Sequence, residues 1–178
     1  MLKKFTQRAK NSILNAQTEA KELGHPAIGT EHVLLGILRE GEGIAARALN
    51  SVGVTLTTAR EAVMNMVGAK AIPPQAVPDE LPITPRVKRV LFTLALDEAT
   101  QQGVNYVGTE HLLLGLLAEA DGLANTILRN LNVNLGELRA QVFSLLGGNV
   151  PESAEPEDNR SAAPTRSEER RVGKECRS

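Results

Sequence analysis

The sequence predicts an all-α protein built from one helical unit that occurs twice. Three observations predict this class. A block of sequence recurs almost unchanged later in the chain, apolar residues fall at helical spacing, and glycine and proline lie mostly between the periodic segments. Aromatic residues are only 2% of the chain, so the apolar residues are mainly Leu, Val, Ile and Ala. That composition suits helices packed closely on helices.

The repeated block shows the duplication most clearly. Residues 29–38 read GTEHVLLGIL and residues 108–117 read GTEHLLLGLL, so Gly29 returns as Gly108. Between Glu19 and Met64, 19 of 46 positions are identical in this register, far more than chance gives in so short a window. The two halves of the chain are therefore expected to share one fold.

The register changes once, near the start of the second copy. Glu19 returns as Glu98, in the same register as the repeated block, whereas Thr6 returns as Thr84, one position earlier than that register requires. One extra residue therefore lies in the first helix of the second copy, between Thr84 and Glu98. Because one residue turns a helix by about 100°, we expect a local bulge there or a different helix start.

The first copy is expected to form four helices. In the first, Thr6 is the expected N-cap and Gly24 the C-terminal stop. Thr30 is expected to cap a short second helix, a third runs from about Gly43 to Asn50, and a fourth follows Thr55. The expected buried faces are Phe5, Ala9, Ile13, Ala16, Ala20 and Leu23 in the first helix, Val33, Leu34, Ile37 and Leu38 in the second, and Leu56, Ala59, Val63 and Val67 in the fourth.

The second copy is expected to repeat these helices. Its predicted caps are Thr84 (with Pro85 at the first helical position), Thr109, Asp121 and Asn134. The predicted organisation is residues 1–68 for the first repeat, 69–82 for a Pro-rich linker, 83–147 for the second repeat and 148–165 for a disordered linker. Residues 166–178 resemble the translation of a short-read sequencing adapter, and they hold the only cysteine, Cys176.

Composition and motifs exclude several functional classes. The net charge of −1 and the scattered aromatic residues argue against nucleic-acid binding, including a helix-turn-helix, because the short Leu-rich helices after Thr30 and Thr109 begin without Lys or Arg. No apolar run is long enough to span a membrane and no signal peptide is present, so we expect a cytoplasmic protein without membrane contact. Neither a phosphate loop nor a nucleophile arrangement occurs, so neither an enzyme nor a bound cofactor is expected.

The three histidines are weak candidates for metal ligands. His32 and His111 each follow a glutamate, with no second His or Cys at ligand spacing beside them. They are predicted to pack or donate hydrogen bonds where helices meet. His25 is expected in a loop and carries no functional signal.

At the paired GTEH blocks the sequence resembles the double Clp-N repeat, the amino-terminal domain of Clp-type AAA+ unfoldase chaperones, and it is most similar to the ClpC branch. The resemblance covers residues 2 to about 147. It implies two tandem four-helix repeats, about eight helices, related by pseudo-two-fold symmetry. It also implies the partners: unfolded or phosphoarginine-tagged client proteins, adaptor proteins, the AAA+ ring modules of a longer parent chain, and the Clp protease. A stand-alone accessory protein that binds a protease core is the alternative.

The same resemblance implies two equivalent phosphoarginine sites, Thr6 with Glu31 in the first copy and Thr84 with Glu110 in the second. A helix amino terminus can hold a phosphate, and a carboxylate can hold a guanidinium through two parallel hydrogen bonds. A second interpretation stays open, in which the threonines only cap helices and the glutamates only complement helix dipoles.

A second partner surface is also considered. Leu2, or the short helices after Gly43 and Gly122, could dock an adaptor helix, although ordinary packing explains these residues as well. The copies differ here, since Ala118 stands where the first copy has Arg39. A partner that binds this loop would contact one basic residue fewer in the second copy than in the first.

Overall fold

The computed structural model describes residues 3–67 and 79–148 of the chain. Leu2, most of the predicted linker 69–82, nearly all of 148–165 and the adapter-like 166–178 lie outside these residues. Within the described part, no helix combines the length and the apolar character needed to cross a membrane.

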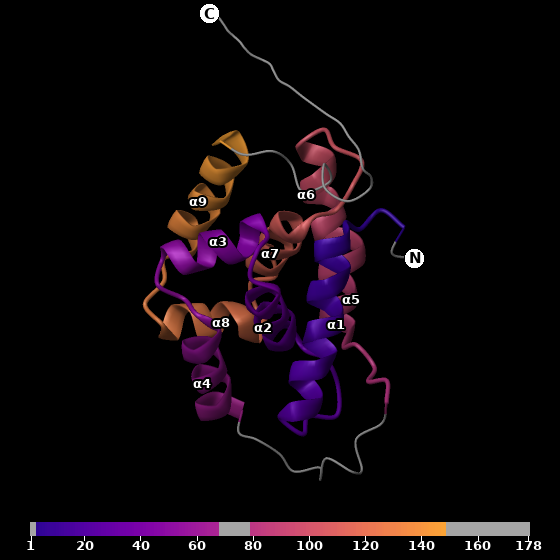
Figure 1. Cartoon of the computed structure of the whole chain (residues 1–178), viewed down its shortest axis with the longest axis vertical. Helices are drawn as coiled ribbons and strands as arrows, with labels where there is room; N and C mark the ends of the chain where they lie inside the picture. The colour runs from indigo at the N-terminus through magenta and orange to yellow at the C-terminus, as the bar shows by residue number, and fades with distance from the viewer. Residues whose placement is uncertain (1–2, 68–78, 149–178) are drawn as a thin grey trace, which may run out of the picture.

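The described residues form helices and no strands, which confirms the all-α prediction (Figure 1). The first copy contains α1 (Gln7–Glu22), α2 (Thr30–Glu40), α3 (Ile44–Ser51) and α4 (Leu56–Val67). The second contains α5 (Pro85–Arg89), the π-helical segment η2 (Val90–Leu94), α6 (Ala95–Gln101), α7 (Thr109–Ala118), α8 (Leu123–Asn130) and α9 (Leu135–Gly148). Because α5, η2 and α6 follow one another without a break, they form one helix equivalent to α1, and the described residues hold eight helices.

The predicted bulge is the π-helical segment. The N–H of Ala95 bonds the carbonyl of Val90, five residues earlier, and Val90 and Ala95 both keep right-handed helical dihedrals. A π turn absorbs one extra residue and leaves the helix on either side in register. The extra residue between Thr84 and Glu98 is therefore accommodated in one π turn, and the helix buries the same face before and after it.

The two copies are joined by matching backbone hydrogen bonds. The N–H of Thr6 donates to the carbonyl of Val107 (2.9 Å), and in the equivalent place the N–H of Thr84 donates to the carbonyl of Ile28 (3.1 Å). Each pair forms part of an isolated parallel bridge, between Phe5 and Val107 and between Ile28 and Ile83. The segment before the first helix of each copy thus lies beside the segment before the second helix of the other copy, which confirms the pseudo-two-fold relation.

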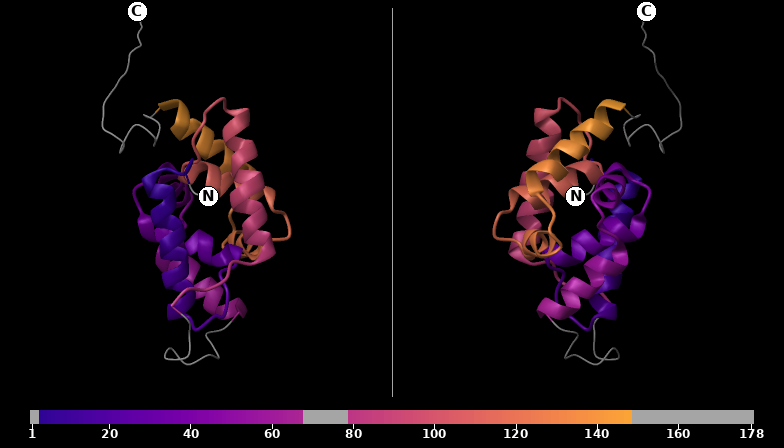
Figure 2. Two further views of the ribbon diagram at one scale, coloured as in Figure 1. Left: turned by 90° about the vertical axis from the view of Figure 1, so that its right-hand side faces the viewer. Right: turned by 90° about the vertical axis from the view of Figure 1, so that its left-hand side faces the viewer.

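The last helix of each copy also contacts the other copy. Helix α4 contacts α8 of the second copy, and α9 contacts α3 of the first. Figure 2 shows the two copies side by side, with α9 and α4 toward opposite ends of the molecule. Each copy therefore completes its core against the other.

Two predicted caps have a different role. Gly29 and Gly108, not Thr30 and Thr109, are the N-caps of α2 and α7, since a histidine nitrogen at the third helical position accepts the cap N–H. The threonine hydroxyls instead reach the other copy. Thr30 accepts the N–H of Ala124 (3.1 Å), and Thr109 accepts the N–H of Ala45 (3.4 Å).

The other predicted caps and buried residues differ from the structure at two notable positions. Gly122 rather than Asp121 is the N-cap of α8, and Val67 at the end of α4 is exposed rather than inward. The predicted cap hydroxyls and amide of Thr6, Thr55, Thr84 and Asn134 accept backbone N–H bonds, and Gly24 follows α1 with a left-handed φ of 74°.

Candidate functional site

A cavity of about 790 Å³ lies between the two copies. Its wall in the first copy is the loop before α2, the first turn of α2 and the end of α4. Its wall in the second copy is the start of α5, the end of α7 and the start of α8. The polar and charged residues that line it are His25, Thr30, Glu31, His32, Thr84, Arg86, Arg89 and Glu119.

Glu31 brings a carboxylate to this cavity from the first turn of α2. Its side chain is 12% exposed. Burial raises the pKa of Glu31, while a hydrogen bond with its own backbone and the nearby His25 lower it. A Cβ at Gly29 would lie 2.4 Å from Oε1 of Glu31, so glycine at this position leaves the space that the carboxylate occupies. The GTE sequence therefore places an acid where a ligand can reach it.

Thr84 lines the same cavity from the other copy. Its hydroxyl accepts the N–H of Val87 (3.2 Å) and caps the helix that begins at Pro85. The expected pairing within each copy is therefore not the pairing that the structure shows, because Glu31 shares its cavity with Thr84 rather than with Thr6. The cause is the backbone exchange between copies, which sequence spacing does not reveal.

The other two predicted residues, Thr6 and Glu110, lie in closed surroundings. Thr6 is buried and bonded to Val107, at the start of the loop that leads to Glu110. Glu110 is fully buried, at 0% exposure. Tyr106, which stands where the first copy has Ala27, packs edge-on against the ring of His111 beside Glu110, at 5.8 Å between centroids. The two predicted sites are thus not equivalent, and the one with Glu31 is the more open.

Two arginines, Arg86 and Arg89, line the cavity from the second copy and are not among the residues predicted from the sequence. Arg86 Nε lies 3.1 Å from Oε2 of Glu119, and Arg89 Nε lies 3.5 Å from Oε1. A sequence signal existed, because Arg86 and Glu119 are the repeats of Arg8 and Glu40. The cavity therefore carries the Glu31 carboxylate on the wall of the first copy, and two guanidinium groups that share the Glu119 carboxylate on the wall of the second.

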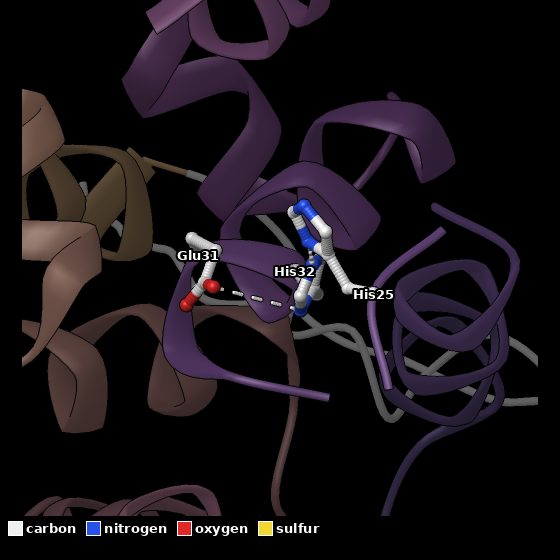
Figure 3. Close-up of side chains that lie close together, drawn as sticks. All are labelled: His25, Glu31 and His32. Atoms are coloured by element: carbon white, nitrogen blue, oxygen red, sulfur yellow. Dashed lines mark hydrogen bonds and ion pairs between the residues drawn. The ribbon is translucent and has the colours of Figure 1, made fainter. Parts of the chain in front are cut away.

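His32 forms the floor of this site through two hydrogen bonds. Its Nδ1 accepts the N–H of Gly29 (2.9 Å), so a neutral ring carries its proton on Nε2 and donates it to Nδ1 of His25 (2.7 Å; Figure 3). His25 lies in the loop before α2, as expected, and it is buried there. The loop before α2 folds back and brings it to His32, seven residues later in the chain.

Burial keeps both repeated histidines neutral. It lowers the pKa of His32 to about 3, with a further contribution from His25, and that of His111 to about 4. His111 repeats the arrangement, with Nδ1 accepting the N–H of Gly108 and Nε2 facing Oε1 of Gln102 at 3.0 Å. The expectation that these histidines pack and form hydrogen bonds at the helix starts is confirmed.

The group of His25, Glu31 and His32 has the residue types of a metal site, with ligand atoms within 4.8 Å of one another. Its hydrogen bonds oppose that use. An imidazole that binds a metal through Nε2 carries a proton on Nδ1, and this proton would meet the N–H of Gly29. Glu31 also lies on the Nδ1 side of His32, 3.9 Å away, whereas His25 lies on the Nε2 side (Figure 3). The hydrogen bonds of His25 and His32 instead hold the loop before α2 against the first turn of that helix.

Comparison with known families gives two matches along the chain. The Clp repeat (R) N-terminal domain family matches residues 4–94 and again residues 91–170. The chain belongs to the Clp repeat family. The resemblance inferred from the GTEH blocks is therefore confirmed. The first match covers the first copy and continues through η2 of the second, and the second match covers the remainder of the second copy.

Curated relatives support the Clp repeat assignment. An ATP-dependent Clp protease ATP-binding subunit ClpA homolog of Guillardia theta is 47% identical over 165 residues, which are 93% of this chain and 20% of that protein. The negative regulator of genetic competence ClpC/MecB of Bacillus subtilis (strain 168) is 44% identical over 162 residues, 91% of this chain and 19% of that protein. The chain spans about a fifth of the length of the curated relatives that it matches.

Solved structures share the fold. The N-terminal domain of the caseinolytic protease associated chaperone ClpD from Arabidopsis thaliana has a TM-score of 0.69 and 30% identity, and covers 82% of this chain and 99% of that one. A complex of a ClpV N-domain with a VipB peptide has a TM-score of 0.63 and 18% identity, covers 86% of this chain and 91% of that one, and supports the fold alone.

Proposed function

We propose that this Clp repeat chain is the substrate- and adaptor-binding domain of an ATP-dependent Clp protease subunit, and that the cavity between its copies binds phosphoarginine on client proteins. In this proposal the ATPase and protease activities belong to other modules and subunits. The binding domain delivers clients to them in the cytoplasm.

The observation that carries this proposal is the arrangement of charge across the cavity. Phosphoarginine has a guanidinium-type group next to a phosphate. A carboxylate such as that of Glu31 can bind the guanidinium side, and the phosphate side fits a helix start with a threonine hydroxyl, Thr84, and two arginines. A plain arginine lacks the phosphate, and a phosphoserine lacks the guanidinium, so each would satisfy only one side.

The proposal also includes binding of peptides or adaptors outside the cavity, for which no particular partner is named. The N-domain of ClpV binds a VipB peptide, which shows that this fold can present a peptide site in one protein. The chain described here carries exposed Leu14, Met64 and Phe143 on its surface. We place adaptor contacts on such residues without assigning a partner.

Calorimetric titration with phosphoarginine, arginine and inorganic phosphate tests the phosphoarginine site. We expect phosphoarginine to bind at least about tenfold more tightly than arginine, because a second charged group is held. Glu31→Gln should lower the affinity about tenfold, and Glu110→Gln should lower it less. Equal binding of phosphoarginine by the wild type and by Glu31→Gln would overturn the assignment.

A further inference from the structure

The cluster of Arg86, Arg89 and Glu119 on the cavity wall is not explained by helix packing. The two arginines are 48% and 63% exposed, while the carboxylate between them is only 8% exposed. Arg86 also donates from a terminal nitrogen to the carbonyl of Asp121 (2.9 Å). Two partly exposed cations thus share one buried anion at the edge of the cavity.

The equivalent acid in the first copy does something else. Oε1 of Glu40 accepts the N–H groups of Glu42 (3.1 Å) and Gly43 (2.9 Å), so this carboxylate holds the loop after α2. The repeat of Arg86, Arg8, lies 3.8 Å from the other oxygen of Glu40. Glu40 therefore caps its loop and faces one arginine at long range, whereas Glu119 faces two arginines.

The loop sequence causes this difference. Gly41 in the first copy has a left-handed φ of 80°, which turns the following N–H groups toward Glu40. The second copy has Ala120 in this position, and its loop is held from α8 instead. There the amide of Asn125 donates to the carbonyls of Leu117 (3.1 Å) and Glu119 (2.9 Å). The Glu119 carboxylate is left to face Arg86 and Arg89.

We propose that Glu119 is a built-in competitor of the bound phosphate, and that it sets the affinity of the cavity for anions by occupying Arg86 and Arg89. The identity of the ligand rests on the proposed function, but the anion class rests on the two arginines alone. A phosphate displaces the carboxylate from the two guanidinium groups and leaves Glu119 in place on the cavity wall. Glu119 thus determines affinity and specificity rather than binding the ligand.

The energetics favour such an exchange. Both arginines are more than a third exposed, so water and salt weaken their attraction to Glu119. A phosphate carries about 1.5 to 2 negative charges at pH 7 and accepts bidentate bonds from arginine, so it competes well with one carboxylate. Removing the Glu119 charge should raise phosphate affinity about fivefold, as expected for one partly screened charge.

The test follows the arginine Nε–H signals of ¹⁵N-labelled protein by NMR while inorganic phosphate and then phosphoarginine are added. In the wild type, phosphate should shift the Arg86 and Arg89 signals. In Glu119→Gln, which keeps the shape of the side chain, half-saturation should need about fivefold less phosphate. Arginine without phosphate should bind Glu119→Gln no better than the wild type, because the substitution removes negative charge.

Glu40→Gln is the matched control, because it removes the repeated acid outside the cavity, and it should leave the phosphate midpoint unchanged. If Glu119→Gln fails to fold, Arg89→Gln replaces it and should weaken phosphate binding. Unchanged or weaker phosphate binding in folded Glu119→Gln, or in its place unchanged binding in Arg89→Gln, would overturn the inference. A phosphate effect without any phosphoarginine binding would keep the inference and reject the proposed function.

Discussion

The two copies of the Clp repeat use the same exchanged contacts and yet present different surfaces. Both start their first helix against the other copy, and both use a GTEH threonine to bond the third helix of the other copy. Around the repeated glutamates they differ. Glu31 faces a cavity with Thr84 and two arginines, whereas Glu110 is fully buried. The duplication therefore preserves the contacts that join the copies, whereas the surroundings of the repeated glutamates have diverged.

The two copies differ most strongly in how closely the backbones of their first two helices approach each other. A Cβ at Gly36 of α2 would lie 2.1 Å from the carbonyl oxygen of Ser12 and 2.7 Å from the nitrogen of Ala16 in α1. At the repeated Gly115 the nearest atom is the nitrogen of Ala95 at 3.0 Å, because the π segment widens the facing helix. The first copy thus tolerates no side chain here, and the second has a little space.

Gly36→Ala should consequently have the largest effect on stability. In an exposed helix this change stabilises by about 1 kcal/mol, so a loss would report the clash alone. We expect a loss of about 3 kcal/mol in the free energy of unfolding from urea titration, against about 1 kcal/mol for Gly115→Ala. Equal losses in the two variants would contradict the difference in helix spacing.

Lowering the pH should destabilise both copies through His32 and His111. Their pKa values are about 3 and about 4 in the folded state, below the usual value near 6.5, so the unfolded chain binds more protons between these values. Stability is full above pH 6.5 and falls as the pH drops below it, by up to about 1.4 kcal/mol per pH unit for each histidine. From pH 7 to pH 5.5 we expect a loss of about 2.5 kcal/mol.

Urea titrations at pH 7, 6 and 5.5 measure this loss. His32→Gln and His111→Gln should each remove about half of the slope. A flat stability curve over this range would show that the two histidines have the same pKa in the folded and the unfolded chain. The account of the neutral His25–His32 bond would then be wrong.

A buried ion pair gives a third difference between the copies. Glu19, fully buried, bonds both Arg39 (2.8 Å) and Arg60 (3.0 Å), whereas Glu98 bonds Arg139 (3.0 Å), since Ala118 stands at the repeat of Arg39. Glu19→Gln should cost about 2 kcal/mol and Glu98→Gln about 1 kcal/mol, values reduced because the arginines are partly exposed. Restoring the missing cation with Ala118→Arg should stabilise the wild type and not Glu98→Gln.

The threonines between the copies should have the smallest effects. Thr30→Val removes the acceptor of the Ala124 N–H at 3.1 Å, and Thr109→Val that of the Ala45 N–H at 3.4 Å. We expect losses of about 1 kcal/mol and about 0.5 kcal/mol in the free energy of unfolding. A thermal melt that splits into two transitions in the double variant would show that the copies are coupled mainly by these bonds.

Much of the fold could be predicted because a duplication shows itself directly in the sequence. The helix pattern and the caps at Thr6 and Thr84 follow from periodicity, and the bulge before Glu98 follows from the single change of register between the copies. These features are local, so the spacing of residues along one helix determines them.

The candidate site could be predicted only in part. The residues Glu31 and Thr84 were selected, but which threonine faces which glutamate depends on the backbone bridges between copies, and a sequence does not show which segments pair. His25 and the Arg86–Glu119 pair were missed for the same reason, since each becomes informative only through a neighbour on another element. Contacts between segments far apart in the chain determine which of the predicted residues lie together in one site.

A double-mutant cycle with phosphoarginine tests the central claim, that the site forms across the two copies. Affinities are measured by calorimetry for Glu31→Gln, Thr84→Val, Thr6→Val and the combinations of Glu31→Gln with each threonine variant. We predict that Glu31 and Thr84 are coupled by at least about 0.5 kcal/mol, because they hold one ligand, and that Glu31 and Thr6 are additive. Coupling of Glu31 to Thr6, with additivity toward Thr84, would contradict the account.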